Sequence, residues 1–555
     1  MNKTEKFWAI LLAVGLVGYL GWQMFAPKPQ PPAQQPAQVE QRSKVAPPVI
    51  AAPKAPVPEQ TVQTAAPEAL MVLENEALKL TVSSLGARVV KAQFKHYPAE
   101  NRPDSAAVEI ATGNLLALEQ PGASALCAYT QREAAPGRLL LEGQLPGGVS
   151  VQRELTLGAG YEVAVTDRFL SAQGQILQPY TLSVGSMTLP EGQGEALGAD
   201  FLADGERKPE YCESRLAKIL GARSAFLGCG TSSDPTGVPL SATERFALAQ
   251  QWVALKSRFF VALVQPQVPG GAELTVSRDG LARNLKIQCV SARVNCPAVQ
   301  LQPGVASEVS ARLYVGPKKL DQLRAFGAHA DAVMDFGFFG WVCKLLLPIL
   351  NICYRIIPNY GVAIILLTLL VRLVFWPLTH KSTVAMRKMS VIQPQIKALQ
   401  QQFKDQPQKI QQETFKLYRE HKVNPFSSCL PMLVQIPIFI ALFVVLRSAI
   451  ELRFASFLWI ADLSQPENLL AGVLPVPLNI LPILTAVTMG LQTALSPSTG
   501  DPAQKRMMTW MMPAMLLFMF YQMASALCLY WTVSQLLSIL QMWHIQRTSA
   551  RQGQA

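Results

Sequence analysis

The feature that most restricts the possible folds of this chain is a set of long apolar segments that are almost free of charge. At 1.5 Å per residue, about 20 residues of helix cross a hydrocarbon core of ~30 Å. One such run lies near the start of the chain, and five more lie after Pro348, at about 7–25, 356–378, 429–446, 473–495, 507–523 and 526–545. The sequence therefore predicts a polytopic α-helical membrane protein with six transmembrane helices.

The first apolar run follows Lys3 and Lys6. Its 19 residues exceed the about 7 to 15 apolar residues of a cleavable signal peptide, and no clear small-residue cleavage site follows. We expect an uncleaved transmembrane anchor over residues 1–25, with a cleaved signal peptide as the alternative. Residues 26–69 are rich in Pro, Gln and Ala, a composition that cannot build a core and predicts an extended linker.

Short runs with alternating apolar residues, such as Leu78, Leu80 and Val82, recur through residues 70–335 between Gly and Pro turns. Alternation with a period of two is typical of half-buried strands, so we expect an all-β sandwich or a related fold folded in water. Five of the nine cysteines lie in this region. They could form a disulfide, for which the candidate pairs are Cys289 with Cys296 and Cys212 with Cys229, or they could remain free buried thiols. An amphipathic interfacial helix is expected at 336–347.

Basic residues gather in the loop between the second and third apolar segments, at 380–424. This loop holds nine Lys or Arg residues against three acidic ones. Short loops rich in Lys and Arg stay in the cytoplasm, which also accounts for the net charge of +12 without invoking nucleic-acid recognition. Both termini are therefore expected in the cytoplasm, and the β region on the opposite side.

The basic loop also has helical periodicity. Apolar residues follow spacings of three and four, at Met389, Ile392, Ile396, Leu399 and Phe403. A helix break near Pro407 and a second helix to about residue 422 predict an antiparallel hairpin. Its basic side chains could bind ribosomes, targeting factors or anionic lipids, or the hairpin could be only a solvated structural loop; the candidates are Lys388, Lys397, Lys404, Lys409 and Lys416.

Arg372 is the only charged residue of segment 356–378. An arginine inside a membrane costs at least ~2.5 kcal/mol, so a functional role is the first hypothesis and snorkelling towards lipid headgroups is the alternative. Polar residues one turn before it and on other segments could line a hydrated cavity around it or make ordinary interhelical hydrogen bonds; they are Thr368 on the same segment and Gln435, Thr532 and Gln535 on others. The second to sixth segments contain no Asp or Glu, which argues against a coupled transporter.

The fifth apolar segment is rich in methionine, whose flexible side chain accommodates irregular apolar partners. These methionines either contact varied client helices or simply face lipid: Met507, Met508, Met511, Met512, Met515, Met519 and Met523. The five histidines lack a metal-binding spacing, and no Walker A, GxSxG or HExxH motif occurs. We therefore expect no enzyme activity, no catalytic residue, no metal and no cofactor.

Four stretches carry a resemblance to the YidC/Oxa-type insertase family, in its Gram-negative form with a large periplasmic domain. They are LLTLLVRLVFWP at 366–377, VNP at 423–425, CLPMLVQIP at 429–437 and LYWTVS at 529–534. The resemblance implies an inner-membrane protein with a periplasmic β-supersandwich, a five-helix core at 348–546 and a short cytoplasmic tail at 547–555. It also implies insertion of nascent membrane proteins, alone or with the Sec translocon, without nucleotide hydrolysis.

Site residues follow from the same resemblance. A hydrophilic groove containing Arg372 would receive the polar part of a client, and the client's apolar segment would slide along the third and fifth segments, past Phe439, Met511, Met515 and Met519. Two other functions stay open at this point. A solute transporter would require paired intramembrane charges, and a mutarotase-like periplasmic enzyme would require an acid and a base in the β domain.

Overall fold

The computed structural model describes residues 68–120, 126–188, 198–203, 209–211, 242–247, 250–268, 273–281, 286–403, 406–421, 430–471, 473, 477–495 and 502–552. The chain divides into two units, 1–65 and 66–555, and all described residues belong to the second. The predicted anchor at 1–25 lies outside the described residues, as does the predicted linker except for its last two residues.

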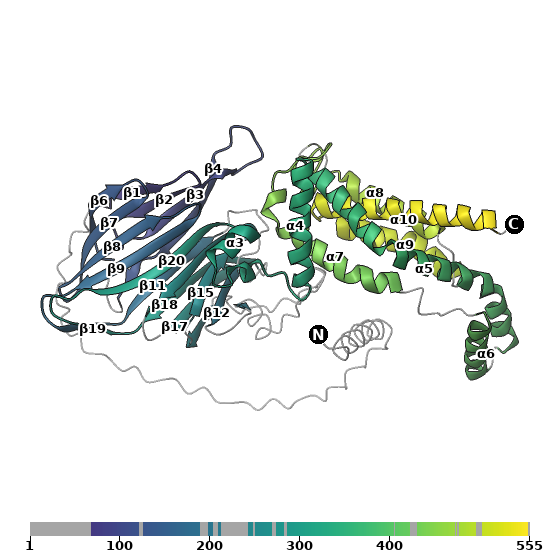
Figure 1. Ribbon diagram of the computed structural model, residues 1–555, viewed down its shortest axis with the longest axis horizontal. Helices are drawn as coiled ribbons and strands as arrows, with labels where there is room; N and C mark the ends of the chain where they lie inside the picture. Colours follow the sequence, from purple (N-terminus) through teal and green to yellow (C-terminus); the bar gives the residue numbers. More distant parts are fainter. Residues whose placement is uncertain are drawn as a thin grey trace, which may run out of the picture. The chain divides into compact units, whose positions relative to one another are not determined.

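The first sheet is a four-stranded antiparallel meander in which each strand pairs with the next. Figure 1 shows it with the labels β1 to β4; the strands are Leu70–Glu74, Leu78–Ser83, Val89–Pro98 and Ala107–Leu115. Leu78, Leu80 and Val82, the alternating residues of β2, are fully buried. The period-two pattern in the sequence therefore places one face of this sheet in the core.

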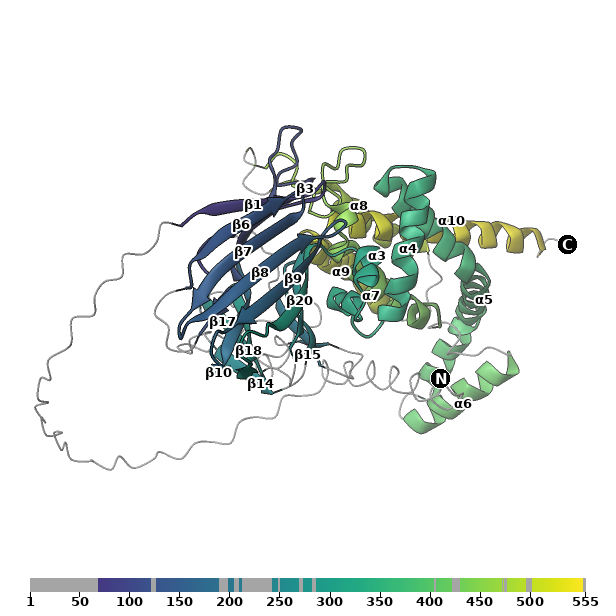
Figure 2. The same cartoon turned by 60° about the vertical axis from the view of Figure 1, so that its left-hand side comes forward.

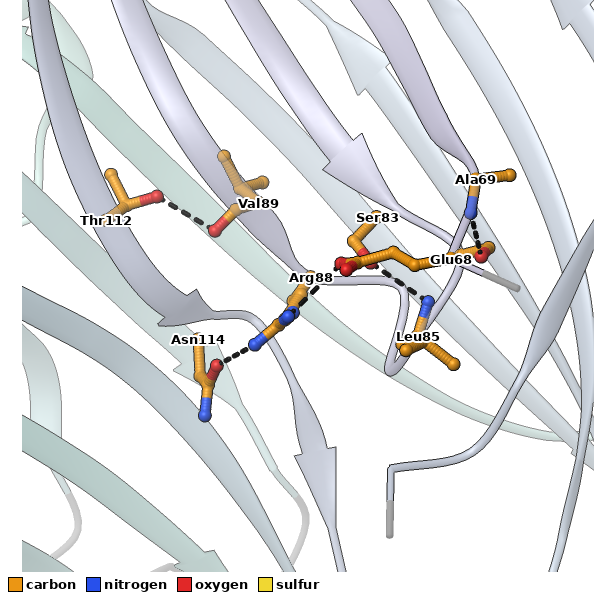
Figure 3. Close-up of polar contacts among 9 residues, drawn as sticks. Glu68, Ala69, Ser83, Leu85, Arg88, Val89, Thr112 and Asn114 are labelled. Atoms are coloured by element: carbon orange, nitrogen blue, oxygen red, sulfur yellow. Dashed lines mark hydrogen bonds and ion pairs between the residues drawn. The ribbon is translucent and has the colours of Figure 1, made fainter. Parts of the chain in front are cut away.

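The chain enters this sheet through a small polar network (Figure 3). The Ser83 hydroxyl donates to the Glu68 carboxylate at 2.5 Å, and the Arg88 guanidinium lies 3.2 Å from the same carboxylate. These two contacts, the Ser83 bond first, lower the pKa of Glu68. Arg88 also donates to Asn114 on β4, so the network joins the entry of β1 to the far strand of the sheet.

The second sheet has nine antiparallel strands in the order β13-β12-β15-β16-β20-β9-β8-β7-β6. Side chains of β8 and β9 alternate between buried and partly exposed, which fits the alternation expected from the sequence. In chain order the strands are Tyr129–Ala135, Arg138–Leu145, Val149–Leu157, Glu162–Leu170, Gly198–Ala203, Glu210–Tyr211, Gln250–Lys256, Phe260–Gln267 and Ser307–Pro317.

A third sheet has five strands in the order β14-β17-β18-β11-β5, and its β11 lies against β4 of the first sheet. At its junction with β4, Gly185 has φ +92°, and a Cβ there would lie 2.5 Å from the Thr112 carbonyl oxygen, so only glycine fits without strain. In chain order the strands are Leu118–Glu119, Tyr180–Thr188, Ala242–Ala247, Glu273–Leu281 and Lys286–Cys296; β10 (Gln175–Leu177) and β19 (Val299–Leu301) form a separate pair.

Aromatic residues join the nine-stranded sheet to the layer formed by the other two. Phe94 on β3 stacks on Phe260 of β16 with ring centroids 4.8 Å apart, and Phe169 on β9 meets Tyr180 of β11 at 5.6 Å. All four side chains are buried, and Figure 2 shows the strands of the two layers. The prediction of an all-β sandwich is confirmed.

A buried ion pair lies within the nine-stranded sheet, and its arginine also reaches the opposite layer. Arg153 on β8 donates from Nε and Nη2 to the two carboxylate oxygens of its cross-strand neighbour Asp167, at 2.6 and 2.7 Å. Its Nη1 donates to the backbone carbonyls of Ala87, at 3.1 Å, and Leu116, in the opposite layer. Every part of the guanidinium is therefore paired, as burial of a charge requires.

Cys296 tests one of the two candidate disulfides, the pair with Cys289. Its thiol is free and buried, which excludes the alternative pair with Cys289 in this structure. Burial raises the pKa of Cys296 to about 11. The other candidate pair, Cys212 with Cys229, lies outside the described residues.

Helices follow the last strand of the sandwich. They are α3 (Leu320–Phe326), η1 (Ala330–Met334), α4 (Gly340–Ile356), α5 (Tyr360–Gln402), α6 (Pro407–Glu420), α7 (Leu430–Ser448), η3 (Ile450–Leu452), α8 (Ile480–Leu495), α9 (Pro502–Phe520) and α10 (Ser525–Gln552). In α4, which overlaps the expected amphipathic helix at 336–347, Trp341, Leu345 and Ile352 are exposed while Leu346 and Leu350 are buried.

Within the part of the chain that the structure describes, two helical stretches are long and apolar enough to cross a membrane, Tyr360–Met386 and Ser525–Ile545. Three shorter apolar stretches coincide with the other expected segments, at Gln435–Ser448, Ile480–Leu495 and Met507–Phe520. Helix α8 begins seven residues after the expected start at 473, because the Glu467 carboxylate accepts hydrogen bonds from the first backbone N–H groups at Ile480 and Leu481. The number of spans stays a prediction.

Candidate functional site

The candidate site is built on two long helices, α5 and α10, which pack along each other. Asn359 begins α5 by accepting a hydrogen bond from the Val362 backbone N–H at 3.2 Å. Ser525 begins α10, and its hydroxyl and backbone N–H both donate to the Gln465 carbonyl. Both helices are apolar over their first 20 residues, so the polar side chains that they share stand out.

Arg372 lies on α5 and points to α10. Its Nε donates to the Ser534 hydroxyl at 3.1 Å, and its Nη2 donates to the same hydroxyl at 2.6 Å and to the Ser534 carbonyl oxygen at 2.8 Å. Helices α4, α5 and α7 to α10 contain no Asp or Glu. Neutral oxygens therefore hold the cation, and its charge is not cancelled within the helices.

The other residues proposed for the groove take part in several different contacts. Gln435 on α7 donates to the Tyr530 hydroxyl on α10 at 2.9 Å. Thr368, one turn before Arg372, donates instead to the Ile364 carbonyl of its own helix at 2.6 Å. These contacts match the alternative interpretation of ordinary helix hydrogen bonding, and neither residue bonds to Arg372.

Thr532 and Gln535 lie on a different part of α10. The Thr532 and Thr485 hydroxyls are 2.7 Å apart and join α10 to α8. Gln535 is 6% exposed, and its Oε1 has no hydrogen-bond partner among the described residues. A buried amide oxygen without a protein partner is costly, and a bound water molecule can satisfy it.

Sequence reasoning missed Ser534 and Tyr530 as partners. Both lie within LYWTVS, and polar residues recur on α10 at spacings of three and four, at Tyr530, Ser534, Ser538 and Gln541. This periodicity could have indicated a polar face on α10. Which of them meets Arg372 depends on how the two helices align, and that alignment is set by tertiary packing.

The residues proposed for the client slide differ in exposure. Met511 and Met515 on α9 are 57% and 60% exposed, whereas Met519 is partly buried against the core. Phe439 on α7 is also partly buried, with its ring 4.7 Å from that of Trp531 on α10. The exposed face of α9 is extended by other apolar side chains: Met507, Met508, Trp510, Met512 and Phe518.

Helix α5 continues without a break into the hairpin, where it packs on α6. Met389, Ile392 and Ile396 are buried, and Leu417 and Tyr418 of α6 pack against them. The basic side chains lie outside this contact: Lys388, Lys397, Lys409 and Lys416 are exposed, whereas Lys404 lies outside the described residues. Two of them have local partners, because Lys409 lies over the Phe403 ring at 4.9 Å and Lys416 lies 3.8 Å from Glu413.

Two protein-family models match the chain. Residues 352–552 match the family described as 60Kd inner membrane protein, and residues 236–349 match the YidC periplasmic domain. The first match contains Arg372 and Ser534, and the second covers the later part of the β sandwich together with α3, η1 and part of α4.

Relatives with the name Membrane protein insertase YidC match to different extents. One from Pelobacter propionicus is 39% identical over 310 residues, and this match spans 55% of this chain and 56% of the relative. One from Aeromonas salmonicida is 31% identical over 573 residues, 98% of each chain. A crystal structure described as an active YidC insertase with the first transmembrane domain resolved is 18% identical, covers 85% of this chain and 91% of that chain, and has a TM-score of 0.35.

The first of these matches spans only about half the length of the relative. The second spans both chains almost from end to end and so includes the β sandwich as well as the helices. Insertion of membrane proteins, and not an enzyme reaction, is what the relatives' names describe. The chain belongs to the YidC family of membrane protein insertases.

Proposed function

We propose that this chain inserts nascent membrane proteins into the inner membrane of a bacterium and helps them to fold there. The single observation that carries the proposal is the uncancelled charge of Arg372, held by Ser534 between helices that contain no Asp or Glu. An intramembrane arginine persists only where its cost is offset, and intramembrane ionisable residues mark pathways for polar substrates.

In this proposal Arg372 sits in a hydrated groove that receives the hydrophilic segment of a client. Its positive charge attracts acidic side chains over several ångströms, since the surroundings screen a charge less than bulk water does. Thr368, Gln435, Thr532 and Gln535 line or shape the same groove. Water in the groove shortens the apolar distance that a polar segment must cross.

The apolar segment of the client moves along a slide formed by α7 and α9. Met511 and Met515 are exposed and flexible, so they adapt to client helices of different shape. Phe439, which meets Trp531 edge to face, and the partly buried Met519 form the inner side of the slide. Transfer of the client helix into lipid supplies the driving force, so no nucleotide is consumed.

The arrangement across the membrane follows from the basic loop at 380–424. It places the hairpin and both termini in the cytoplasm and the β domain in the periplasm, with six spans in all. Ribosomes, targeting factors or anionic lipids bind the exposed lysines of the hairpin, and the Sec translocon is a partner for larger clients. The domains are an anchor at 1–25, a linker at 26–69, the β domain at 70–335, the interfacial helix at 336–347, the core at 348–546 and the tail at 547–555.

Site-specific photo-crosslinking tests the slide. A photoreactive amino acid at Met511 or Met515 should crosslink to the apolar segment of a ribosome-stalled client. The matched control is Leu540 on α10, which is apolar and 58% exposed but lies outside the slide. Equal crosslinking at Leu540 would mean that exposure alone governs the contact and would contradict the slide.

A further inference from the structure

Helices α5 and α10 share two polar contacts that are one heptad apart. Arg372 binds Ser534, and seven residues later on both helices the Gln541 side-chain amide donates to the Thr379 hydroxyl at 2.9 Å. Because the offset between partners is 162 residues in both contacts, the two helices run in the same direction with a fixed alignment. The pair thus offers one contact that involves the cation and a matched contact that does not.

Ser534 supplies all the hydrogen bonds that Arg372 makes with described residues. Its hydroxyl accepts from Nε and Nη2, and its backbone carbonyl accepts from Nη2. The same carbonyl also accepts a bond from the Ser538 hydroxyl at 3.0 Å. Ser534 itself is 6% exposed, so its oxygens have few competing partners in water.

Without this contact the Arg372 side chain could adopt a different, more extended conformation. A long cationic side chain in an apolar helix extends towards the nearest polar interface. On α5 that direction is marked by Thr379 and His380, about 10 to 12 Å further along the helix. The bonds to Ser534 hold the guanidinium level with that residue of α10.

The bonds also fix which edge of the guanidinium stays available. Nε and Nη2 face Ser534, whereas Nη1 makes no hydrogen bond to any other described residue. The two N–H groups of Nη1 can therefore donate to a carboxylate or to water. A guanidinium keeps its planar shape, so binding one edge orients the opposite edge.

The geometry points to Ser534 as a positioning residue that holds the Arg372 guanidinium at its depth and presents Nη1 to an acidic client segment. This inference rests on the proposed function, since it assigns to Ser534 the placement of the charge that receives the client. Ser534 acts through Arg372 and does not itself contact the client.

The test compares Ser534→Ala with Ser534→Thr and with Thr379→Val. Ser534→Ala removes the hydroxyl and should lower insertion of a client with an acidic translocated tail by about tenfold, the factor that corresponds to ~1.4 kcal/mol. Ser534→Thr keeps the hydroxyl and should keep most of the activity. Thr379→Val breaks the matched contact without touching Arg372 and should leave insertion unchanged.

Two further arms separate positioning from packing. Neutralising the acidic residues of the client should remove most of the effect of Ser534→Ala. In an Arg372→Ala background, Ser534→Ala should cause no additional loss, because the group that it positions is absent. All comparisons are made at equal abundance of the full-length protein in the membrane.

The outcomes are distinguishable. Normal insertion by Ser534→Ala while Arg372→Ala is impaired would overturn the role of Ser534 alone. An equal loss in Thr379→Val, or a further loss from Ser534→Ala in the Arg372→Ala background, would show that helix packing is responsible. Normal insertion by Arg372→Ala would overturn the electrostatic part of the proposed function, and this inference with it.

Discussion

At the scale of single residues, the partly buried Arg372 of the helices and the buried Arg153 of the β sandwich are stabilised in different ways. Arg372 is held by a hydroxyl and a backbone carbonyl, so its charge is stabilised but not neutralised. Arg153 is paired with the Asp167 carboxylate at 2.6 Å and is fully enclosed. The first arrangement leaves a charge that can act on a client, and the second only stabilises the fold.

Replacement of Arg372 tests whether its charge or its bidentate geometry is needed. If a positive charge within the groove is sufficient, Arg372→Lys should keep most insertion, since lysine supplies the same charge with fewer donors; if Ser534 must also orient the Nη1 edge, Arg372→Lys should lose insertion to about the same extent as Ser534→Ala. Arg372→Ala should lower insertion of clients with acidic tails by about tenfold or more, and Arg372→Glu should be worse. Insertion yields for clients with acidic and neutralised tails measure this, and a loss that ignored client charge would indicate groove hydration instead.

The Arg153 and Asp167 pair predicts a stability effect without a functional one. Arg153→Met leaves the Asp167 carboxylate buried without a partner and should lower the free energy of unfolding of the sandwich by ~3–5 kcal/mol. Hydrogen exchange of β8 and β9 in the full-length protein measures the loss. A double replacement of both residues by apolar ones should restore much of the stability, and a double variant as unstable as the single one would contradict this account.

At the scale of elements, sequence patterns located the helices better than they located helix ends. Long apolar runs indicated α5 and α10, because hydropathy is a property of the segment itself. The start of α8 depends on Glu467, which lies thirteen residues before Ile480 and accepts from its N–H. Local signals of a helix start were also present, because Pro475, Pro477 and Asn479 come directly before Ile480. The expected start at 473 relied on hydropathy alone and was therefore too early.

In the candidate site, too, the sequence predicted the key residue but not its partners. Arg372 could be found from the sequence because a single charge in an apolar run is conspicuous. The side chain of Gln435 was expected near it, but it donates to Tyr530, and Ser534 is the partner of the arginine. Which residue of another helix becomes a partner depends on how the two helices align. The periodicity within one helix does not predict that alignment.

The cytoplasmic hairpin carries the prediction at this scale. Its apolar contact, Met389, Ile392 and Ile396 against α6, is separate from its exposed lysines. Replacing the four described lysines with glutamine should therefore weaken insertion while leaving the hairpin folded; these are Lys388, Lys397, Lys409 and Lys416. Shortening residues 388–420 should weaken insertion more than it weakens folding of the core.

Insertion assays at two salt concentrations, together with protease resistance of the core, measure both variants. Salt screens the binding of polyanions to exposed lysines. The difference in insertion between the wild-type protein and the glutamine variant should therefore be smaller at high salt. Unchanged insertion after shortening of the hairpin would reduce it to a structural loop.

At the scale of the whole molecule, a loop after α7 makes contacts in two directions. Arg453 in this loop donates to the Pro98 and Ala99 carbonyls of the β domain at 2.8 and 3.1 Å, and Arg258 of the β domain donates to the Ser464 carbonyl at 2.7 Å. The same loop caps α8 through Glu467 and α10 through Gln465. The capping contacts lie entirely within the core segment 348–546.

This separation predicts that the β domain is largely dispensable for insertion. Removing residues 75–300, with the anchor and the interfacial helix at 336–347 kept, deletes Arg258 and the Pro98 and Ala99 carbonyls but leaves Arg372, Ser534 and the hairpin in place. Insertion of a small client should then stay close to that of the intact protein at equal abundance. Protease resistance of α8 and α10 serves as the control, since the caps from Glu467 and Gln465 should hold these helices without the β domain. Lost insertion by a core of normal abundance and normal protease resistance would contradict this division of labour, and would assign the contacts of Arg258 and Arg453 a part in the reaction itself.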